Sequence, residues 1–349
     1  MKRKTKKRAA RRRTPLPQDA MLELLTGYWV SQMLLAVTRL GIVDALGTSA
    51  LAPDALAAKV GANAAYLRRV LRALASVGVF AEDARGRFKA TRLGRTLRSG
   101  EPGSLRDFAL MIVDDYNTQA WESLLDAVRT GRTAFDLRHG VPAFEYLKSH
   151  PEKDRQFSAA MASISGVQNA AVARGYPFGK LRKIVDVGGA HGHLLAAILR
   201  RHKKLRGVLY DQPQVVSAAG ASGFVSADDV RERCEIVGGS FFDSVPSGGD
   251  AYLMKYIIHD WDDAKSARIL SHCRDAMAPG GRVLVVERVI RPGNDADWSK
   301  WLDVNMLVVP GGQERTLDEF RALFASAGLE LVKVHPTQSP LSIVEGARA

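Results

Sequence analysis

A regular alternation of short apolar segments with helical segments begins near Lys183 and constrains the fold of this chain more than any other feature. Helical stretches, such as residues 194–201 and 264–277, lie between the apolar segments. Seven short segments that alternate with helical stretches predict strands, at 184–187, 207–210, 234–237, 251–254, 283–286, 331–334 and 342–344. The alternation predicts an α/β fold with a doubly wound, mostly parallel sheet. The short loop between the last two strands predicts an antiparallel strand at the sheet edge.

A glycine-rich turn follows the first of these strands. Gly188, Gly189 and Gly192 let the backbone turn tightly before the next helix and admit a ligand to the helix N-terminus. The turn matches neither the dinucleotide sequence G-x-G-x-x-G nor a phosphate-binding P-loop. Asp211 ends the second strand, where a carboxylate can accept hydrogen bonds from both hydroxyls of a ribose. The pattern predicts an adenosine-containing cofactor without a pyrophosphate. A purely structural turn with a solvated Asp211 is the alternative.

The N-terminal half of the chain is predicted to be mostly helical. Residues 21–46 carry apolar side chains on more than one side of a helix, which predicts homodimerisation through this segment. Two further helices are expected at 53–59 and 64–77, followed by a hairpin at 79–90. The second of these helices is expected to bury one apolar stripe, formed by Leu67, Val70, Leu71, Leu74 and Val77. Helix, turn, helix and hairpin in this order are typical of a winged helix.

A winged helix raises the hypothesis of DNA binding. Arg68, Arg69 and Arg72 are expected on the exposed side of the second helix. The hairpin, however, carries Glu82 and Asp83 where DNA phosphates would lie. We therefore favour the interpretation that these arginines form an ordinary solvent-exposed helix face and do not recognise DNA.

The net charge of +13 is unevenly distributed. Nine of the 50 cationic residues lie between Lys2 and Arg13, and the remaining 41 face 37 anionic residues, which leaves only +4. Residues 1–18 are therefore expected to form a disordered basic tail, and any nucleic-acid contact is expected to be non-specific and confined to residues 2–13. A nucleic-acid-binding surface over the rest of the chain is disfavoured.

The two cysteines and the length of the apolar segments indicate in which cellular compartment the protein is expected. Cys234 and Cys273 show no disulfide or zinc spacing, and are expected to be buried reduced thiols of a cytoplasmic protein. No uninterrupted apolar run reaches the ~18 residues of a membrane span, so no membrane partner is expected. His191 and His193 flank Gly192 without a third ligand at suitable spacing, and no metal site is expected.

Four segments in order carry a family resemblance: VDVGGAHG at 185–192, GGSFF at 238–242, DAYLMKYIIHDWDD at 250–263 and PGGQERT at 310–316. With them, residues 20–349 resemble the class I S-adenosylmethionine-dependent O-methyltransferases of the caffeate and acetylserotonin type, including bacterial relatives that act on natural products. The resemblance implies a Rossmann-like C-terminal domain and a dimer. It also implies a small aromatic acceptor and S-adenosyl-L-methionine as cofactor.

The resemblance also implies residue roles. The methionine end of the cofactor would lie at Gly188, its ribose at Asp211 and its adenine beside Phe241, with Lys255 lining the same pocket. Ser240 stands where relatives usually have an aspartate, so the adenine would meet a hydroxyl. The resemblance places the acceptor at Met161 and Met306. Trp121, Phe144 and Trp298 are further wall candidates on their apolar character.

Methyl transfer to a phenol needs a base, because a neutral phenol with a pKa near ~10 is a poor nucleophile. His259 follows the fourth strand of the predicted sheet, Glu287 ends the fifth, and Glu314 follows a Gly-Gly turn. The resemblance assigns His259 as the general base, with Glu287 and Glu314 fixing its tautomer. If its stretch is extended, Asp260 points to the other side.

Four regions follow from these interpretations: the tail at 1–18, a helical and winged-helix dimerisation domain at 19–104, a helical linker and acceptor-pocket region at 105–180, and a catalytic domain at 181–349. Two alternatives to a methyltransferase stay open. One is a winged-helix DNA-binding regulator whose C-terminal domain senses a ligand. The other is a relative that binds the same cofactor but performs non-methylating chemistry.

Overall fold

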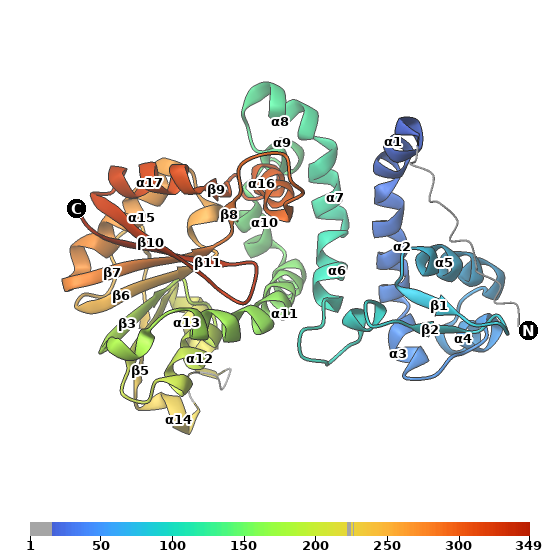
Figure 1. The fold of residues 1–349 in the computed structure, drawn as a ribbon, viewed down its shortest axis with the longest axis horizontal. Helices are drawn as coiled ribbons and strands as arrows, with labels where there is room; N and C mark the ends of the chain where they lie inside the picture. Colours follow the sequence, from blue (N-terminus) through green and yellow to red (C-terminus); the bar gives the residue numbers. More distant parts are fainter. Residues whose placement is uncertain (1–15, 222–224, 226) are drawn as a thin grey trace, which may run out of the picture. The chain divides into compact units, whose positions relative to one another are not determined.

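A computed structural model describes residues 16–221, 225 and 227–349 (Figure 1). The chain forms two compact units, one ending at Ser99 and one beginning at Gly100. Residues 1–15 of the predicted tail lie outside the described residues. Pro17 and Gln18, which were predicted to belong to the tail, lie in the first helix, whose first turn tolerates proline.

The unit that ends at Ser99 contains helices and one hairpin. Its elements are α1 (Pro17–Leu25), α2 (Gly27–Arg39), α3 (Ile42–Leu46), α4 (Pro53–Val60), α5 (Ala64–Ser76), β1 (Phe80–Glu82), β2 (Phe88–Ala90) and η1 (Gly94–Leu97). The Asn63 side chain caps α5 by accepting a hydrogen bond from the Tyr66 backbone (3.1 Å). The predicted order of two helices and an antiparallel hairpin is present. Its assignment as a winged helix stays a prediction.

The stripe predicted on α5 is buried at Leu67, Leu71 and Leu74. Val77 was expected to continue it, but this side chain is 47% exposed. The helix ends at Ser76 and Val77 is its C-cap residue, so the helical spacing no longer directs the side chain inward.

Helices α1 and α2 expose a broad apolar face. Leu24, Leu25, Tyr28 and Trp29 are all exposed. By length and composition alone, the span Pro17–Arg39, which comprises α1 and α2, is the one candidate for a membrane span among the described residues, and 11% of its apolar 18-residue window is buried. Asp19, Glu23 and Gln32 interrupt this span, so it holds no uninterrupted apolar run of ~18 residues, and the absence of a membrane partner stays a prediction. The same exposed face suits a helix that packs against a second protein surface.

The second unit begins with helices that lead to the sheet: α6 (Arg106–Ile112), α7 (Asp115–Glu122), α8 (Leu124–Thr130), α9 (Ala134–His139), α10 (Ala143–Ser149), α11 (Pro151–Gly175) and η2 (Phe178–Lys180). Gly131 and Gly140 end α8 and α9 in the left-handed conformation that glycine tolerates best. These helices belong to the same compact unit as the sheet.

A seven-stranded sheet forms the centre of the second unit, and all seven predicted strands are present. Their order is β10-β11-β7-β6-β3-β4-β5. Strands β5, β4, β3, β6 and β7 run parallel, whereas β11 pairs antiparallel with both β7 and β10. The bounds are β3 (Lys183–Val187), β4 (Arg206–Asp211), β5 (Cys234–Gly238), β6 (Gly249–Lys255), β7 (Met277–Glu287), β10 (Leu329–Pro336) and β11 (Ser342–Arg348).

Helices cover both faces of this sheet, as Figure 1 shows. Ile184 and Leu253 face a core that includes α12, while Val185 and Met254 face a core built with α15 and α17. Burial on both faces explains the nearly continuous apolar sequences of the central strands β3, β4 and β6. The remaining elements are α12 (His193–Arg201), α13 (Pro213–Ala221), α14 (Asp228–Arg231), η3 (Ile258–Asp260), α15 (Asp263–Ala276), β8 (Val289–Ile290), α16 (Trp298–Val308), β9 (Arg315–Thr316) and α17 (Leu317–Ser326).

Candidate active site

The glycine-rich turn lies at the carboxyl end of β3. Gly188 has a φ of +71° and donates a backbone hydrogen bond to the Tyr210 carbonyl (2.8 Å). A Cβ atom at Gly188 would stand 2.4 Å from Ile257 Cδ1 and 3.7 Å from Phe241 Cε1. The structure therefore brings the predicted Gly188 and Phe241 together. A side chain on the turn would fill the space beside them.

Asp211 is held at the same turn by two backbone donors. Ala190 donates to Asp211 Oδ2 (2.8 Å), and Gln212 donates to Oδ1 (2.7 Å). Burial raises the pKa of Asp211 above its usual value, and the two hydrogen bonds oppose that rise. Each oxygen keeps a lone pair for a further donor, which suits the predicted ribose contact.

Asp186, which the sequence interpretation did not select, lies directly beneath the turn. Its Oδ2 would be 2.7 Å from a Cβ at Gly189, and it has no hydrogen-bond partner in the described part of the chain. Burial and the charge of Asp211 raise the pKa of Asp186 to about 7. A buried carboxylate oxygen without a hydrogen-bond partner is costly, so Oδ2 of Asp186 is suited to a further donor or a cationic ligand. The only signal in the sequence is one acid within an otherwise apolar strand.

Lys255 ends β6 next to this carboxylate. Its Nζ donates to Asn169 Oδ1 on α11 (2.8 Å). Burial lowers the pKa of Lys255 to about 8, while the charge of Asp186 opposes the shift. Lys255 therefore lies with the other predicted cofactor residues, and Asn169 joins them from a helix far away in sequence.

An aromatic wall follows β5. Phe241 contacts the rings of Phe242 and Trp261 edge to face, with centroid distances of 4.9 and 6.2 Å. Ser240 Oγ accepts a hydrogen bond from the Phe242 backbone (3.2 Å), which leaves the hydroxyl hydrogen able to donate elsewhere. A flat, apolar surface of this kind can stack on a planar base.

His259 lies at the carboxyl edge of the sheet and is only 7% exposed. Its Nδ1 is 2.6 Å from Glu314 Oε1. Glu287 Oε1 accepts a hydrogen bond from the His259 backbone N–H (3.0 Å). The parallel pairing of β8 with β9 brings the chain after Glu287 beside the chain after Glu314, and so assembles the cluster.

The three predicted catalytic residues therefore lie together, but their contacts differ from one another. Glu314 contacts the imidazole ring, whereas Glu287 positions the backbone of the turn instead of the ring. Burial raises the pKa of Glu287 to about 7. Its Oε2 has no hydrogen-bond partner among the described residues.

Asp260 was expected to point away from His259, and this expectation is wrong. The segment Ile258–Asp260 is a 3-10 turn and not an extended strand, so consecutive side chains do not alternate. Asp260 Oδ1 lies 3.5 Å from His259 Nε2, a long contact for a hydrogen bond but close enough for attraction. Burial would lower the pKa of His259, but the charges of Asp260 and the two glutamates outweigh it and raise the pKa to about 9.

Arg315 holds the turn that carries His259, a role that the sequence interpretation did not assign. Its buried guanidinium donates to the carbonyls of Ile258 (3.1 Å) and Trp261 (3.0 Å) and to Asp263 Oδ1 (2.8 Å). Ile258 begins η3, Trp261 directly follows η3, and Asp263 begins α15. The guanidinium fork matches several acceptors at once, so Arg315 fixes the backbone on which the imidazole is mounted.

The proposed acceptor residues lie on helices of the second unit. Met161 packs against the apolar cluster that includes Phe144, and Met306 is buried on α16. Phe144 lies near the Trp261 ring, with a centroid distance of 6.2 Å. Met161 and Met306 as acceptor contacts stay predictions. Trp121 is 39% exposed and is therefore only partly suited to line a pocket.

Tyr256 extends the site beyond His259. The two rings are stacked with centroids 5.0 Å apart, and Gln168 Nε2 donates to the Tyr256 hydroxyl (3.1 Å). Tyr256 has a φ of +57°, in the left-handed region that a bulky residue rarely adopts. Such strain is typical of a residue that the surroundings hold for function.

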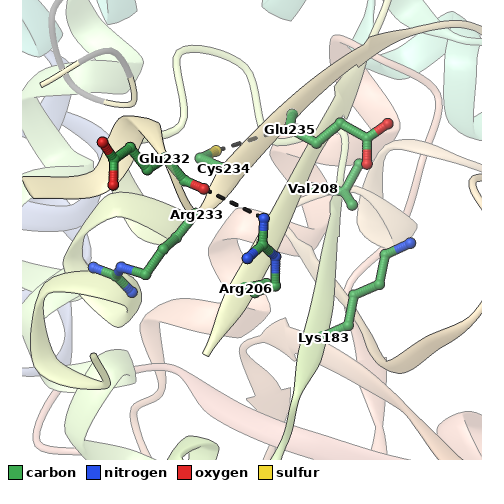
Figure 2. Close-up of a pocket in the computed structure, with 8 residues that line it drawn as sticks. Lys183, Arg206, Val208, Glu232, Arg233, Cys234 and Glu235 are labelled. Atoms are coloured by element: carbon green, nitrogen blue, oxygen red, sulfur yellow. Dashed lines mark hydrogen bonds between the residues drawn. The ribbon is translucent and has the colours of Figure 1, made fainter. Parts of the chain in front are cut away.

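A separate hollow of about 400 Å³ lies where strands β3, β4 and β5 begin, at the edge of the sheet opposite to their carboxyl ends (Figure 2). Its lining mixes cations with acids, and Arg206 donates to the backbone carbonyl of Glu232 (3.3 Å). Ligands of open α/β sheets bind at the carboxyl edge, so this hollow is not the candidate site. No group of three metal-ligating side chains occurs among residues 16–221, 225 and 227–349.

Comparisons with known proteins identify the family. Residues 121–330 match the O-methyltransferase domain, and residues 22–100 match the O-methyltransferase dimerisation domain. The chain belongs to the O-methyltransferase family. The dimerisation match covers most of the exposed apolar face of α1 and α2, and it supports the predicted homodimer.

Relatives within the O-methyltransferase family align over nearly the whole chain. Phenazine O-methyltransferase PhzM of Lysobacter antibioticus is 45% identical over 93% of this chain and 94% of its own length. Phenazine-1-carboxylate N-methyltransferase of Pseudomonas aeruginosa is 33% identical over 94% of this chain and 97% of its own. The crystal structure of CalO1, a methyltransferase in calicheamicin biosynthesis in its SAH-bound form, has a TM-score of 0.88 and 36% identity. It covers 97% of this chain and 100% of that one.

Proposed function

We propose that this protein transfers a methyl group from S-adenosyl-L-methionine to a phenolic hydroxyl of a small aromatic acceptor, with His259 as the general base. The observation that carries the proposal is the 2.6 Å contact of Glu314 with His259 Nδ1, inside a buried site at the carboxyl edge of the sheet. With Nδ1 engaged by a carboxylate, Nε2 is the nitrogen that can accept a proton.

The residues at the turn fit the proposed cofactor. The unpartnered Oδ2 of the buried Asp186 and the glycines of the turn suit a ligand that is cationic and approaches the backbone closely. Asp211 would bind the ribose hydroxyls, and Phe241 and Ser240 would hold the adenine, with Lys255 in the same pocket. Gly188 would lie against the methionine end. When bound, S-adenosyl-L-methionine supplies an electrophilic methyl group on a sulfonium.

The protein's own residues then supply alignment and proton acceptance. The acceptor hydroxyl loses its proton to His259 Nε2, and the imidazolium formed is stabilised by Glu314 and Asp260. Arg315 and Glu287 hold the backbone of the turn, so the base stays aligned with the hydroxyl. A base with a pKa near 9 is strong enough to compete for a phenolic proton, whose pKa is near ~10.

We further propose Met161 and Met306 as contacts of the acceptor ring, and the cytoplasm as the site of the reaction. The absence of disulfides in the described chain supports the location, since Cys234 and Cys273 are both free thiols. Cys273 is buried as expected, but Cys234 is only partly buried. The DNA-regulator hypothesis loses its basis, because the family assignment makes the protein an enzyme.

Transfer of a labelled methyl group tests the proposal. The enzyme is incubated with methyl-labelled S-adenosyl-L-methionine and a panel of phenols with matched anilines, and the products are resolved by mass spectrometry. We expect label on the phenolic oxygen. Label on nitrogen alone would favour N-methylation, as the name of the Pseudomonas relative indicates for that protein, and cofactor binding without any transfer would favour non-methylating chemistry.

A further inference from the structure

Arg288 is a cation beside the active site that no acid of the described chain neutralises. It directly follows Glu287 at the end of β7 and is half-buried. Its Cζ lies 4.4 Å from the centre of the Trp298 ring. Its Nε is buried without a hydrogen-bond partner, and no carboxylate among the described residues forms an ion pair with it.

Arg288 and His259 are separated by one side chain. The Tyr256 ring stacks on His259 with its centroid 5.0 Å away, and its hydroxyl accepts a hydrogen bond from Gln168. Burial raises the pKa of Tyr256, while the positive charge of Arg288 and a side-chain hydrogen bond from Arg288 oppose that rise, so the guanidinium lies close to the phenolic oxygen. The base, an aromatic ring and a guanidinium therefore follow one another along one side of the site.

A half-buried guanidinium that has no carboxylate partner, and whose Nε has no acceptor, has a definite chemical preference. Taking a charge partly out of water is costly unless a counter-charge or hydrogen-bond acceptors compensate. The stacked Trp298 ring covers one face of the guanidinium and fixes its plane, but a ring offers no lone pairs in that plane. The edge donors of the guanidinium suit a planar anion that accepts two parallel hydrogen bonds, and a carboxylate has that geometry.

We propose that Arg288 binds a carboxylate group of the acceptor, so that the preferred substrates are aromatic hydroxy acids and not neutral phenols. This inference rests on the proposed function. The acceptor places its hydroxyl at His259 Nε2 and its carboxylate at Arg288, with the aromatic body of the substrate lying between the two groups. Trp298 acts as a positioning residue, since it orients the guanidinium.

A binding experiment tests the inference without methyl transfer. Hydroxybenzoic and hydroxynaphthoic acids are titrated calorimetrically into the full-length enzyme with S-adenosylhomocysteine present, each beside its neutral carboxamide. We expect the acid of at least one pair to bind at least tenfold more tightly than its amide. Arg288→Met keeps the apolar stem but removes the charge, and should abolish this preference.

Two further variants serve as controls. Arg291→Met removes an exposed arginine three residues away that already pairs with Asp297 (3.3 Å), and it should leave the preference unchanged. Arg288→Lys keeps the charge but loses the planar fork, so it should retain part of the preference. Should Arg288→Met fail to fold, judged by circular dichroism and Tm, Arg288→Lys carries the test.

The possible outcomes separate the competing explanations. Equal affinity for acids and amides in the wild-type enzyme would overturn the inference. A loss of S-adenosylhomocysteine affinity in Arg288→Met, with the preference for acids intact, would overturn it too, because Arg288 would then bind the carboxylate of the cofactor. Methylation of neutral phenols as fast as acids would contradict the inference and leave the proposed function standing. Methylation of no phenol at all would contradict the proposed function itself.

Discussion

The imidazole of His259 is surrounded by carboxyl groups that have different tasks. Glu314 contacts Nδ1 at 2.6 Å, Asp260 lies 3.5 Å from Nε2, and Glu287 binds the backbone N–H. Their negative charges favour the imidazolium, so the pKa of His259 rises to about 9 against the effect of burial. A general base acts in its neutral form, and the reaction should therefore accelerate as the pH rises toward 9.

Glu314→Gln tests this electrostatic arrangement. The amide still accepts a hydrogen bond from Nδ1 but carries no charge, so the pKa of His259 falls toward its ordinary value. The rising limb of the kcat profile should move to lower pH, and the plateau should fall roughly tenfold to a hundredfold because the imidazolium loses its partner. The measurement is kcat from pH 6 to 10, with the exposed Glu330→Gln as control. A rising limb that stays in place would contradict the assignment.

At the scale of elements, the site depends on the conformation of two short turns, one after β3 and one after β6. The turn after β3 has no room for side chains, because a Cβ at Gly188 would lie 2.4 Å from Ile257 Cδ1 and the φ of Gly188 is +71°. The 3-10 turn after β6 directs two consecutive side chains, His259 and Asp260, to the same place. Both features belong to loops that the rigid sheet positions at its carboxyl edge.

Gly188→Ala should weaken cofactor binding. The added methyl group forces Ile257 to move and strains the backbone, so we expect at least a tenfold loss of affinity for S-adenosylhomocysteine in calorimetry. Gly248→Ala is the matched control, since Gly248 also has a positive φ (+78°) but its Cβ would meet nothing within 4 Å. Equal affinities in the two variants would contradict a cofactor site at the turn after β3.

The strands were predictable because burial on both faces leaves short, nearly continuous apolar segments. The cluster of His259, Glu287 and Glu314 was predictable because each residue follows a recognisable strand or glycine turn. Asp260 was not, because spacing in a sequence does not distinguish a 3-10 turn from an extended segment. The role of Arg315 was not predictable either. It donates to backbone carbonyl groups more than 50 positions away, and every residue type has such a carbonyl, so the sequence does not identify the acceptors.

The whole molecule consists of two compact units that have different functions. The unit ending at Ser99 exposes the apolar face of α1 and α2, and its residues from 22 onward match the dimerisation domain of O-methyltransferases. The unit beginning at Gly100 contains the complete set of candidate catalytic residues. Nine of the thirteen net positive charges come from the cationic residues between Lys2 and Arg13, which are needed for neither function.

Trp29→Glu should disrupt the homodimer. Trp29 is 55% exposed on α2, and a charge at that position would have to be buried in an apolar interface. Light scattering after size exclusion at micromolar concentration should give a dimer for the wild type and a monomer for the variant. Leu93→Glu changes another exposed apolar residue, outside α1 and α2, and should remain dimeric. A dimeric Trp29→Glu variant would place the interface elsewhere.

Deletion of residues 2–15 should leave methyl transfer unchanged, because every predicted catalytic, cofactor and acceptor residue lies after residue 15 in the sequence. Any binding to a polyanion such as heparin should weaken, and its dependence on salt should become shallower, since nine cations are lost. Activity and heparin-column elution are measured on the same preparations. A large loss of kcat in the truncated enzyme would assign the tail a catalytic task.

The central claim, that His259 removes the acceptor proton during methyl transfer, is tested most directly by His259→Ala in a single turnover. Enzyme in excess is mixed with methyl-labelled S-adenosyl-L-methionine and a phenolic acid that the wild type methylates. We predict a rate reduced by roughly a hundredfold or more, with S-adenosylhomocysteine affinity within about threefold of the wild type. A variant that transfers the methyl group at the wild-type rate would contradict the account.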